Sequence, residues 1–250
     1  MKKLLAVSIL SIFLFSCGDK ESSGSSSSGS SSPVEVKLKA SKLTKYMDKA
    51  SVCDLVTTDN TQKLFNTSKE ISFNASGYAS KRSSSVTCNY SWERADVAER
   101  KEKFMTYTID QMQGKVEKVP MRKRTLEHNF SVRLEEYKGS PEQFMPAKLT
   151  EEQLQRQIAS AKEMAAKRLT DEQKKVAGNA ANSMMEKLLR QNNENIKIDG
   201  VGDSAYWTAV GGGSLVVLSG DIKLSISPMI GDDLKQDMEN AKNIAQFVLQ

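Results

Sequence analysis

The C-terminal part of the chain constrains the fold most, because three short apolar runs alternate there with tight-turn sequences. The runs cover residues 205–210, 215–218 and 222–226. Glycines at 211–213 separate the first two runs, and a Ser-Gly-Asp sequence at 219–221 separates the last two. Gly-rich connections of this length are typical of β-hairpins. We therefore predict an antiparallel meander.

An amphipathic helix is expected directly after the meander. Asp232 or Asp233 can cap its N-terminus, because a carboxylate in this position accepts hydrogen bonds from free backbone N–H groups. The apolar residues that follow at helical spacing form one stripe: Leu234, Met238, Ala241, Ala245 and Val248. This stripe has to be buried, and we expect it to cover the sheet.

A further strand is predicted at 86–92. Val86, Cys88, Tyr90 and Trp92 alternate there with more polar residues, which is typical of a half-buried strand. The alternation places all four side chains on one face of the sheet.

The other segments before residue 150 give weaker signals. We expect a helix over 40–50, a second short helix capped by Thr58, and strand fragments with loop over 71–84. Residues 130–134 are a weaker strand candidate. So are residues 104–112, for which a helix is the alternative.

An inserted helical pair is predicted at about 150–192. Thr150 with Gln153, and Thr170 with Gln173, match the capping box of a helix start. A hairpin and one kinked helix fit the short connection equally well. All elements together predict an α+β fold: an antiparallel sheet with helices packed on it, plus these inserted helices.

The N-terminus has the pattern of an export signal. Lys2 and Lys3 precede an apolar stretch at 4–15, which is too short to cross a hydrocarbon core of about 30 Å as a helix. Ser16-Cys17 closes this stretch and resembles the lipobox of bacterial lipoproteins. We therefore expect residues 1–16 to be cleaved and Cys17 to be lipidated; an ordinary secretory signal with an incidental Cys17 is the alternative.

Residues 17–33 are expected to form a lipidated cysteine followed by a flexible tether, because Ser and Gly dominate the segment. The tether leaves 34–250 as a single α+β domain. Lipidation predicts a membrane partner and a place in the bacterial cell envelope, facing the periplasm or the cell surface. Gly18 after the cysteine, by resemblance to enterobacterial sorting, favours the outer over the inner membrane.

Cys53 and Cys88 remain once Cys17 is assigned to lipid. An even number of cysteines in an oxidising compartment predicts a disulfide. A metal or redox pair is the alternative, but neither cysteine belongs to a CxxC motif and neither has a histidine nearby.

The charge balance gives no support for nucleic acid as a partner. The chain has 36 Lys+Arg and 31 Asp+Glu, and loss of Lys2 and Lys3 with the signal leaves 34 against 31, a formal charge of +3. This excess is too small for a nucleic-acid surface.

Three short sequences together resemble a broad group of two-cysteine domains in bacterial envelope lipoproteins. They begin at Cys53, at Cys88 and at Gly202, and read Cys-Asp-Leu, Cys-Asn-Tyr-Ser-Trp and Gly-Asp-Ser-Ala-Tyr-Trp. The resemblance implies a disulfide between the two cysteines and a fold similar to the PsbP-like α/β/α sandwich. It implies no reaction. The helical segment at about 150–192 departs from the group as an insertion.

No catalytic motif, cofactor site or metal site is indicated. His128 is the only histidine, and no motif frames it, so we expect a surface residue. The densest positive stretch is expected to be a solvated loop, with lipid headgroups or acidic glycan as alternative ligands: Lys115, Lys118, Arg122, Lys123 and Arg124. Tyr206 and Trp207 are the candidate binding residues; alternation sends one ring to the core and leaves the other to bind.

These observations predict a membrane-anchored lipoprotein that acts as a non-enzymatic binding or structural module, with an envelope protein or glycan as its partner. The alternative is an envelope hydrolase that acts on peptidoglycan, lipid or glycan. It would use a pair of carboxylates, any two of Glu135, Glu136 and Asp203.

Overall fold

A computed structural model describes residues 39–79, 84–112, 122, 125–168 and 171–250. The chain divides into two units, residues 1–36 and 37–250, and all described residues belong to the second unit. The predicted signal peptide, Cys17 and the tether (residues 1–33) lie outside the described residues, as does Thr170 of the second predicted capping box.

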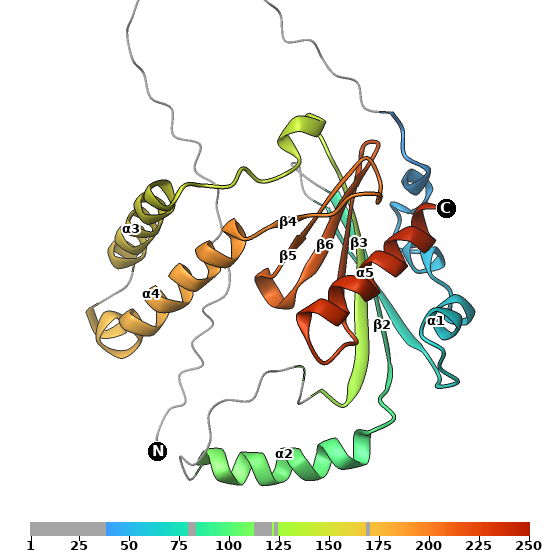
Figure 1. Ribbon diagram of the computed structural model, residues 1–250, viewed down its shortest axis with the longest axis horizontal. Helices are drawn as coiled ribbons and strands as arrows, with labels where there is room; N and C mark the ends of the chain where they lie inside the picture. Colours follow the sequence, from blue (N-terminus) through green and yellow to red (C-terminus); the bar gives the residue numbers. More distant parts are fainter. Residues whose placement is uncertain (1–38, 80–83, 113–121, 123–124, 169–170) are drawn as a thin grey trace, which may run out of the picture. The chain divides into compact units, whose positions relative to one another are not determined.

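The second unit is built on an antiparallel sheet of seven strands in the order β1-β2-β3-β7-β6-β5-β4 (Figure 1). The sheet and its helices confirm the predicted α+β class. The strands are β1 (Ser72–Ala79), β2 (Ser84–Glu93), β3 (Glu127–Glu136), β4 (Ile196–Lys197), β5 (Ser204–Thr208), β6 (Ser214–Ser219) and β7 (Ile222–Met229).

Five α-helices accompany the sheet in the described part of the chain: α1 (Thr58–Leu64), α2 (Val97–Met112), α3 (Glu151–Arg168), α4 (Asp171–Asn193) and α5 (Leu234–Leu249). Short 3-10 helices add single turns at η1 (Lys42–Tyr46), η2 (Val52–Leu55), η4 (Pro141–Gln143) and η5 (Val210–Gly212).

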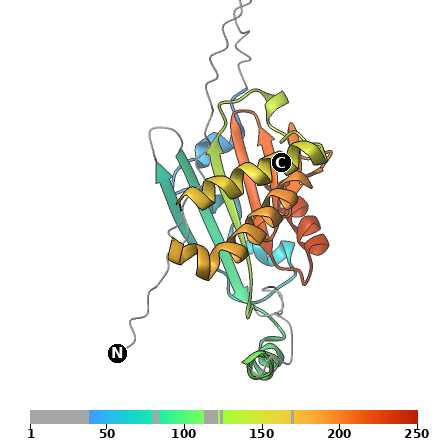
Figure 2. The ribbon, with the colours of Figure 1, turned by 90° about the vertical axis from the view of Figure 1, so that its left-hand side faces the viewer.

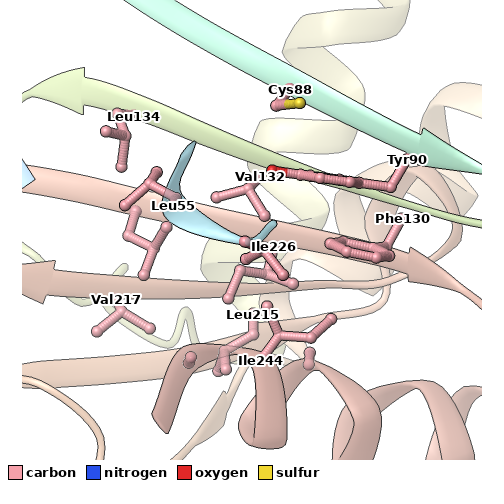
Figure 3. Packing of buried hydrophobic residues seen from close by; sticks show 14 of the residues in the cluster. Leu55, Cys88, Tyr90, Phe130, Val132, Leu134, Leu215, Val217, Ile226 and Ile244 are labelled. Carbon is pink, nitrogen blue, oxygen red and sulfur yellow. The ribbon is translucent and has the colours of Figure 1, made fainter. Parts of the chain in front are cut away.

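One face of the sheet carries the hydrophobic core, because apolar residues alternate with polar ones along the central strands. Tyr90, Phe130, Val132 and Ile226 come from three neighbouring strands and pack together on this face (Figure 3). The stripe of α5 covers β6 and β7 through Ala241, Ala245 and the fully buried Ile244, whereas Leu234, the first residue of the predicted stripe, stays exposed. The predicted meander and the covering helix are therefore confirmed.

Polar residues occupy the opposite face over the first strands of the sheet. On β2 they are Ser85, Thr87, Asn89 and Ser91, which alternate with the core residues. Toward β5 and β6 this face becomes apolar, since Phe144 packs there on Val216, Leu218 and Tyr206.

The disulfide between Cys53 and Cys88 joins η2 to β2, with 5.2 Å between the two Cα atoms. Cys88 is fully buried, and the hydroxyl of Tyr90 donates to the carbonyl oxygen of Cys53 at 3.1 Å. The disulfide predicted from the sequence is confirmed. It holds the short 3-10 helix η2 against the core face of the sheet.

The inserted helices form a hairpin rather than one kinked helix. The Asn193 side chain binds both the N–H and the carbonyl of Leu149, so the end of α4 lies beside the start of α3. Lys162 and Glu186 form an ion pair of 2.7 Å between the two helices. Figure 2 shows the helices side by side. At the start of α3, Thr150 and Gln153 form the predicted capping box.

Several weaker predictions were wrong in detail. Residues 104–112 belong to helix α2, the alternative, and residues 72–79 form one continuous strand. The expected helix at 40–50 is limited to the 3-10 turn η1. The N-cap of α1 is Thr57, whose hydroxyl accepts from the N–H of Asn60, rather than Thr58.

Removal of the disulfide is expected to destabilise the domain by about 3 to 4 kcal/mol, because the unfolded chain regains the entropy of the closed loop. The double variant Cys53→Ala/Cys88→Ala should therefore unfold at a clearly lower urea concentration than the wild type. Addition of dithiothreitol should lower the wild-type midpoint and leave the variant unchanged. Equal midpoints for variant and wild type would contradict the expectation.

Candidate binding surface

The outer edge of β1 is open in the described structure. All eight residues of β1 pair with β2, from Ser72 opposite Ser91 to Ala79 opposite Ser84. β1 is the first strand in the sheet order, and no described strand pairs with its other side. Every second N–H and C=O group of an edge strand points away from its neighbour and can bind another strand. The geometry therefore offers a docking edge one strand long.

The residues of β1 leave this edge accessible. Seven of the eight are exposed, including Phe73 on one face and Tyr78 on the other, with 59% and 64% of their surfaces free. The strand contains no charged residue and no proline, the residues that usually block the edge of a sheet. An uncharged strand with exposed aromatic rings is suited to pairing.

The opposite edge of the sheet is built differently. β4 has only two residues, and one of them is Lys197, which pairs with Asp199 at 2.8 Å. A short charged strand is a common protection against unwanted pairing. The contrast between the two edges identifies β1 as the candidate binding surface.

An ionic network lies at the end of the sheet where β2 leads into α2 and β7 leads into α5. The guanidinium groups of Arg94 and Arg100 bind one oxygen of Asp232, at 2.9 and 2.8 Å. Both also contact Asp96, and the Arg100 contact is 2.7 Å. The two arginines are buried, whereas the two aspartates reach solvent. The network fixes the first turn of α2 to the loop before α5.

A second ion pair extends the network to the core. Arg122 binds the fully buried Asp237 at 2.6 Å and donates a hydrogen bond to the carbonyl of Gly212. The other oxygen of Asp237 accepts from the backbone N–H groups of Ile230 and Gly231, at 3.0 and 2.7 Å. Both oxygens of the Asp237 carboxylate are thus bound by groups of the folded domain, and neither is free to take part in a reaction.

The charges in the network shift the pKa values of nearby groups. Partial burial raises the pKa of Asp96, but the hydrogen bond from Arg100 and the charges of Arg100 and Arg94 outweigh this and lower it overall. Burial lowers the pKa of His128, and the charge of Arg94 lowers it further.

His128 is half-buried, so the expected surface position was wrong. Its ring packs against Trp92, with 5.3 Å between ring centroids, and its Nδ1 lies 2.9 Å from the carbonyl oxygen of Ile230. These contacts give the residue a structural role at the end of the sheet.

The two candidate binding aromatics lie on opposite faces of β5. Trp207 is buried in the core. Tyr206 packs against Phe144, with 5.6 Å between ring centroids, and burial raises the pKa of its hydroxyl, as does the neighbouring Tyr137. Neither ring projects freely from the surface, and their part in binding stays a prediction.

The three carboxylates proposed for a hydrolase make separate interactions. Glu135 binds Lys223 at 2.8 Å, and Glu136 pairs with Lys138 at 3.4 Å. Asp203 accepts from the N–H of Gly220 at 2.6 Å. Because Glu135 and Glu136 are consecutive on β3, their side chains point to opposite faces of the sheet.

Other features of the described residues give no site. The depression beside Gly200, Gln246 and Gln250 has a volume of about 350 Å³, and a second beside Lys39 and Asp203 has about 260 Å³. No group of three His, Cys, Asp or Glu residues in the described ranges could hold a metal ion. None of the described helices is both long and apolar enough to span a membrane. Of the predicted basic stretch, only Arg122 is described, and it is half-buried rather than solvated.

Sequence reasoning missed both the open edge and the ionic network. In 72–79 the residues are small and polar, so the alternation of Phe73 and Tyr78 between faces gives only a weak strand signal. Arg100 lies four residues after Asp96, which is a helix-pair signal. Nothing in the sequence links either residue to Asp232.

Removal of the Arg122 cation is expected to be strongly destabilising, because it leaves the buried carboxylate of Asp237 without a counter-charge. Arg122→Met should lower the free energy of unfolding by about 3 to 5 kcal/mol in urea denaturation. Lys103→Met, which breaks an exposed ion pair with Glu99, serves as the control and should change stability little. Equal effects of the two substitutions would contradict the assignment.

Acid is expected to destabilise the domain through His128. The folded protein has the lower pKa, so the unfolded chain takes up the proton first as the pH falls below about 6.5. The contribution of His128 to the free energy of unfolding is therefore fully present above that pH. It decreases below that pH by at most about 1.4 kcal/mol per pH unit. His128→Gln should flatten the curve of unfolding free energy against pH between about 5 and 7; an unchanged slope would argue against this role.

Comparison of the chain with models of protein families, with curated proteins and with solved structures finds no match to any of them. Any function therefore has to be argued from the sequence and from the geometry of the open edge.

Proposed function

We propose that this chain is a lipid-anchored lipoprotein of the bacterial cell envelope whose domain is a non-enzymatic binding module, and that it docks a protein partner at the outer edge of β1. The observation that carries the proposal is the contrast between the long, uncharged, exposed β1 and the short, charged β4 at the opposite edge. Natural sheets protect edges that must stay single.

The N-terminal sequence supports the anchor. A basic start, a short apolar stretch and Ser16-Cys17 are followed by a Ser/Gly tether. For about 16 flexible residues the root-mean-square reach is about 20 to 25 Å, which is enough to let the domain meet a partner beyond the lipid headgroups. The disulfide supports an oxidising compartment.

Membership of the two-cysteine lipoprotein group is part of this proposal. The disulfide and the arrangement of helices around an antiparallel sheet are compatible with the PsbP-like sandwich that the resemblance implies. We propose the outer membrane as the location, because Gly18 follows the cysteine. The hydrolase alternative has less support, since its three carboxylates are held in separate ion pairs and hydrogen bonds.

The anchor is tested by Cys17→Ala. Cells that express the full chain and grow with an alkyne fatty acid should label the wild type and fail to label the variant. The variant should also leave the membrane fraction, because each buried CH2 of the missing acyl chains contributes about 0.8 kcal/mol of membrane binding. Equal labelling of both proteins would show that Cys17 is not the lipidated residue.

The docking edge is tested by photo-crosslinking in cells. The full chain carries p-benzoylphenylalanine in place of Tyr78, and a matched form carries it in place of Asn89. Both positions are exposed on the same face, but Asn89 lies one strand further in. Tyr78 should give a reproducible adduct under ultraviolet light that Asn89 does not give. The same adduct from both positions, or none from Tyr78, would remove the proposed docking edge.

A further inference from the structure

We propose that the partner at the β1 edge is β1 of a second copy of this chain. The two strands pair antiparallel about a twofold axis that passes perpendicular to the sheet at Ala75. This inference rests on the proposed function, because it uses the same docking edge and names its occupant.

Symmetry and the pleat limit how β1 can pair with itself. Residues directly opposite each other in an antiparallel pair point to the same face of the sheet. A continuous sheet of two copies therefore keeps Phe73 on the core side and Tyr78 on the polar side. A twofold axis at Ala75 satisfies this condition. It places Phe73 opposite Gly77 of the second copy, and Asn74 opposite Ser76 of the second copy.

The side chains on the core side complement each other in this register. Phe73 is 59% exposed, whereas Gly77 has no side chain. Gly77 itself is exposed, and a β-carbon there would meet only ordinary van der Waals contacts, 3.7 Å from a methyl group of Val86 and 3.8 Å from the β-carbon of Lys49. An aromatic ring placed across from a strand glycine covers its exposed backbone. The twofold axis makes this contact occur twice.

The polar side shows the same pairing of large with small. Tyr78 is 64% exposed and lies opposite the small side chain of Ser72 of the second copy. Self-association thus covers part of both aromatic rings that β1 presents to solvent. Cross-strand contacts of aromatic rings are among those that stabilise sheets.

Charge also favours a second copy. In a symmetric pair, a charged residue close to the axis lies near the same residue of the second copy, and like charges that are close together destabilise a sheet. β1 carries no charge from Ser72 to Ala79. The opposite edge has only two residues and carries the ion pair of Lys197 with Asp199, so it offers little backbone to a second copy. The structure is therefore compatible with a closed pair through β1 alone.

The test uses lysines that the twofold register brings together. In Asn74→Lys/Ser76→Lys each lysine faces a lysine of the second copy, and both positions are exposed, so the fold tolerates them. Two differently tagged full-length copies are expressed together, extracted in mild detergent and captured through one tag. Recovery of the second tag measures self-association, which should fall about tenfold in the variant.

A mixture of two oppositely charged variants provides the decisive experiment. One copy carries Asn74→Lys/Ser76→Lys and the other carries Asn74→Glu/Ser76→Glu, so that each lysine faces a glutamate. Self-association of each variant alone should be weak, and the mixture should restore it. Asn89→Lys, on the neighbouring strand, is the matched control and should associate like the wild type. Thermal unfolding of all variants verifies that each is folded.

The outcomes separate this inference from the proposed function. The pairing through β1 is overturned if the lysine variant associates as strongly as the wild type. It is also overturned if the mixture of lysine and glutamate variants does not restore association. A Tyr78 crosslink to a different protein, without a crosslink to a second copy, also overturns it but leaves the docking edge intact. The absence of any crosslink from β1 removes both the inference and the docking edge.

Discussion

The apolar residues of the sheet lie on one face over the central strands, and this decides where the helices must pack. Strand alternation collects the apolar side chains on one face, and η2 and α5 have to cover them. The disulfide holds η2 against β2, and η2 also contacts β1, but seven of the eight residues of β1 stay exposed. On the core side of β1 the residues after Phe73 are small: Ala75, Gly77 and Ala79. Because they need little cover, β1 stays exposed, and the sheet keeps an edge that can pair.

The ionic network holds together the elements at the end of the sheet, where β2 leads into α2 and β7 leads into α5. Buried arginines cost desolvation energy, so they persist where several carboxylates and carbonyls satisfy them. Here Asp232 and Asp237 tie the loop before α5 to α2 and to Arg122. The positive and negative charges balance inside the network. It therefore stabilises the contacts between these elements and is not itself a binding site.

Sequence patterns predicted those parts of the fold that have strong periodicity. The meander, α5 and β2 show clear alternation or a helical stripe, and the capping box at Thr150 marks the start of α3. The segment at 104–112 was ambiguous, because Phe104, Met105 and Ile109 stay exposed on α2 and follow no core pattern. The pairing of Arg94 with Asp232 spans 138 residues and is decided by the topology of the sheet alone. The open edge was equally hidden, since strand order cannot be read from the spacing of residues.

Hydrogen exchange of the β1 backbone amides in the full-length protein shows directly whether this edge pairs with a second strand. Outward-pointing N–H groups of a free edge exchange rapidly, and pairing with a second strand protects them. We expect protection in Ser72–Ala79 to rise with protein concentration, while amides of β4 show no such change. Rapid exchange in β1 at every concentration, with no partner added, would contradict it.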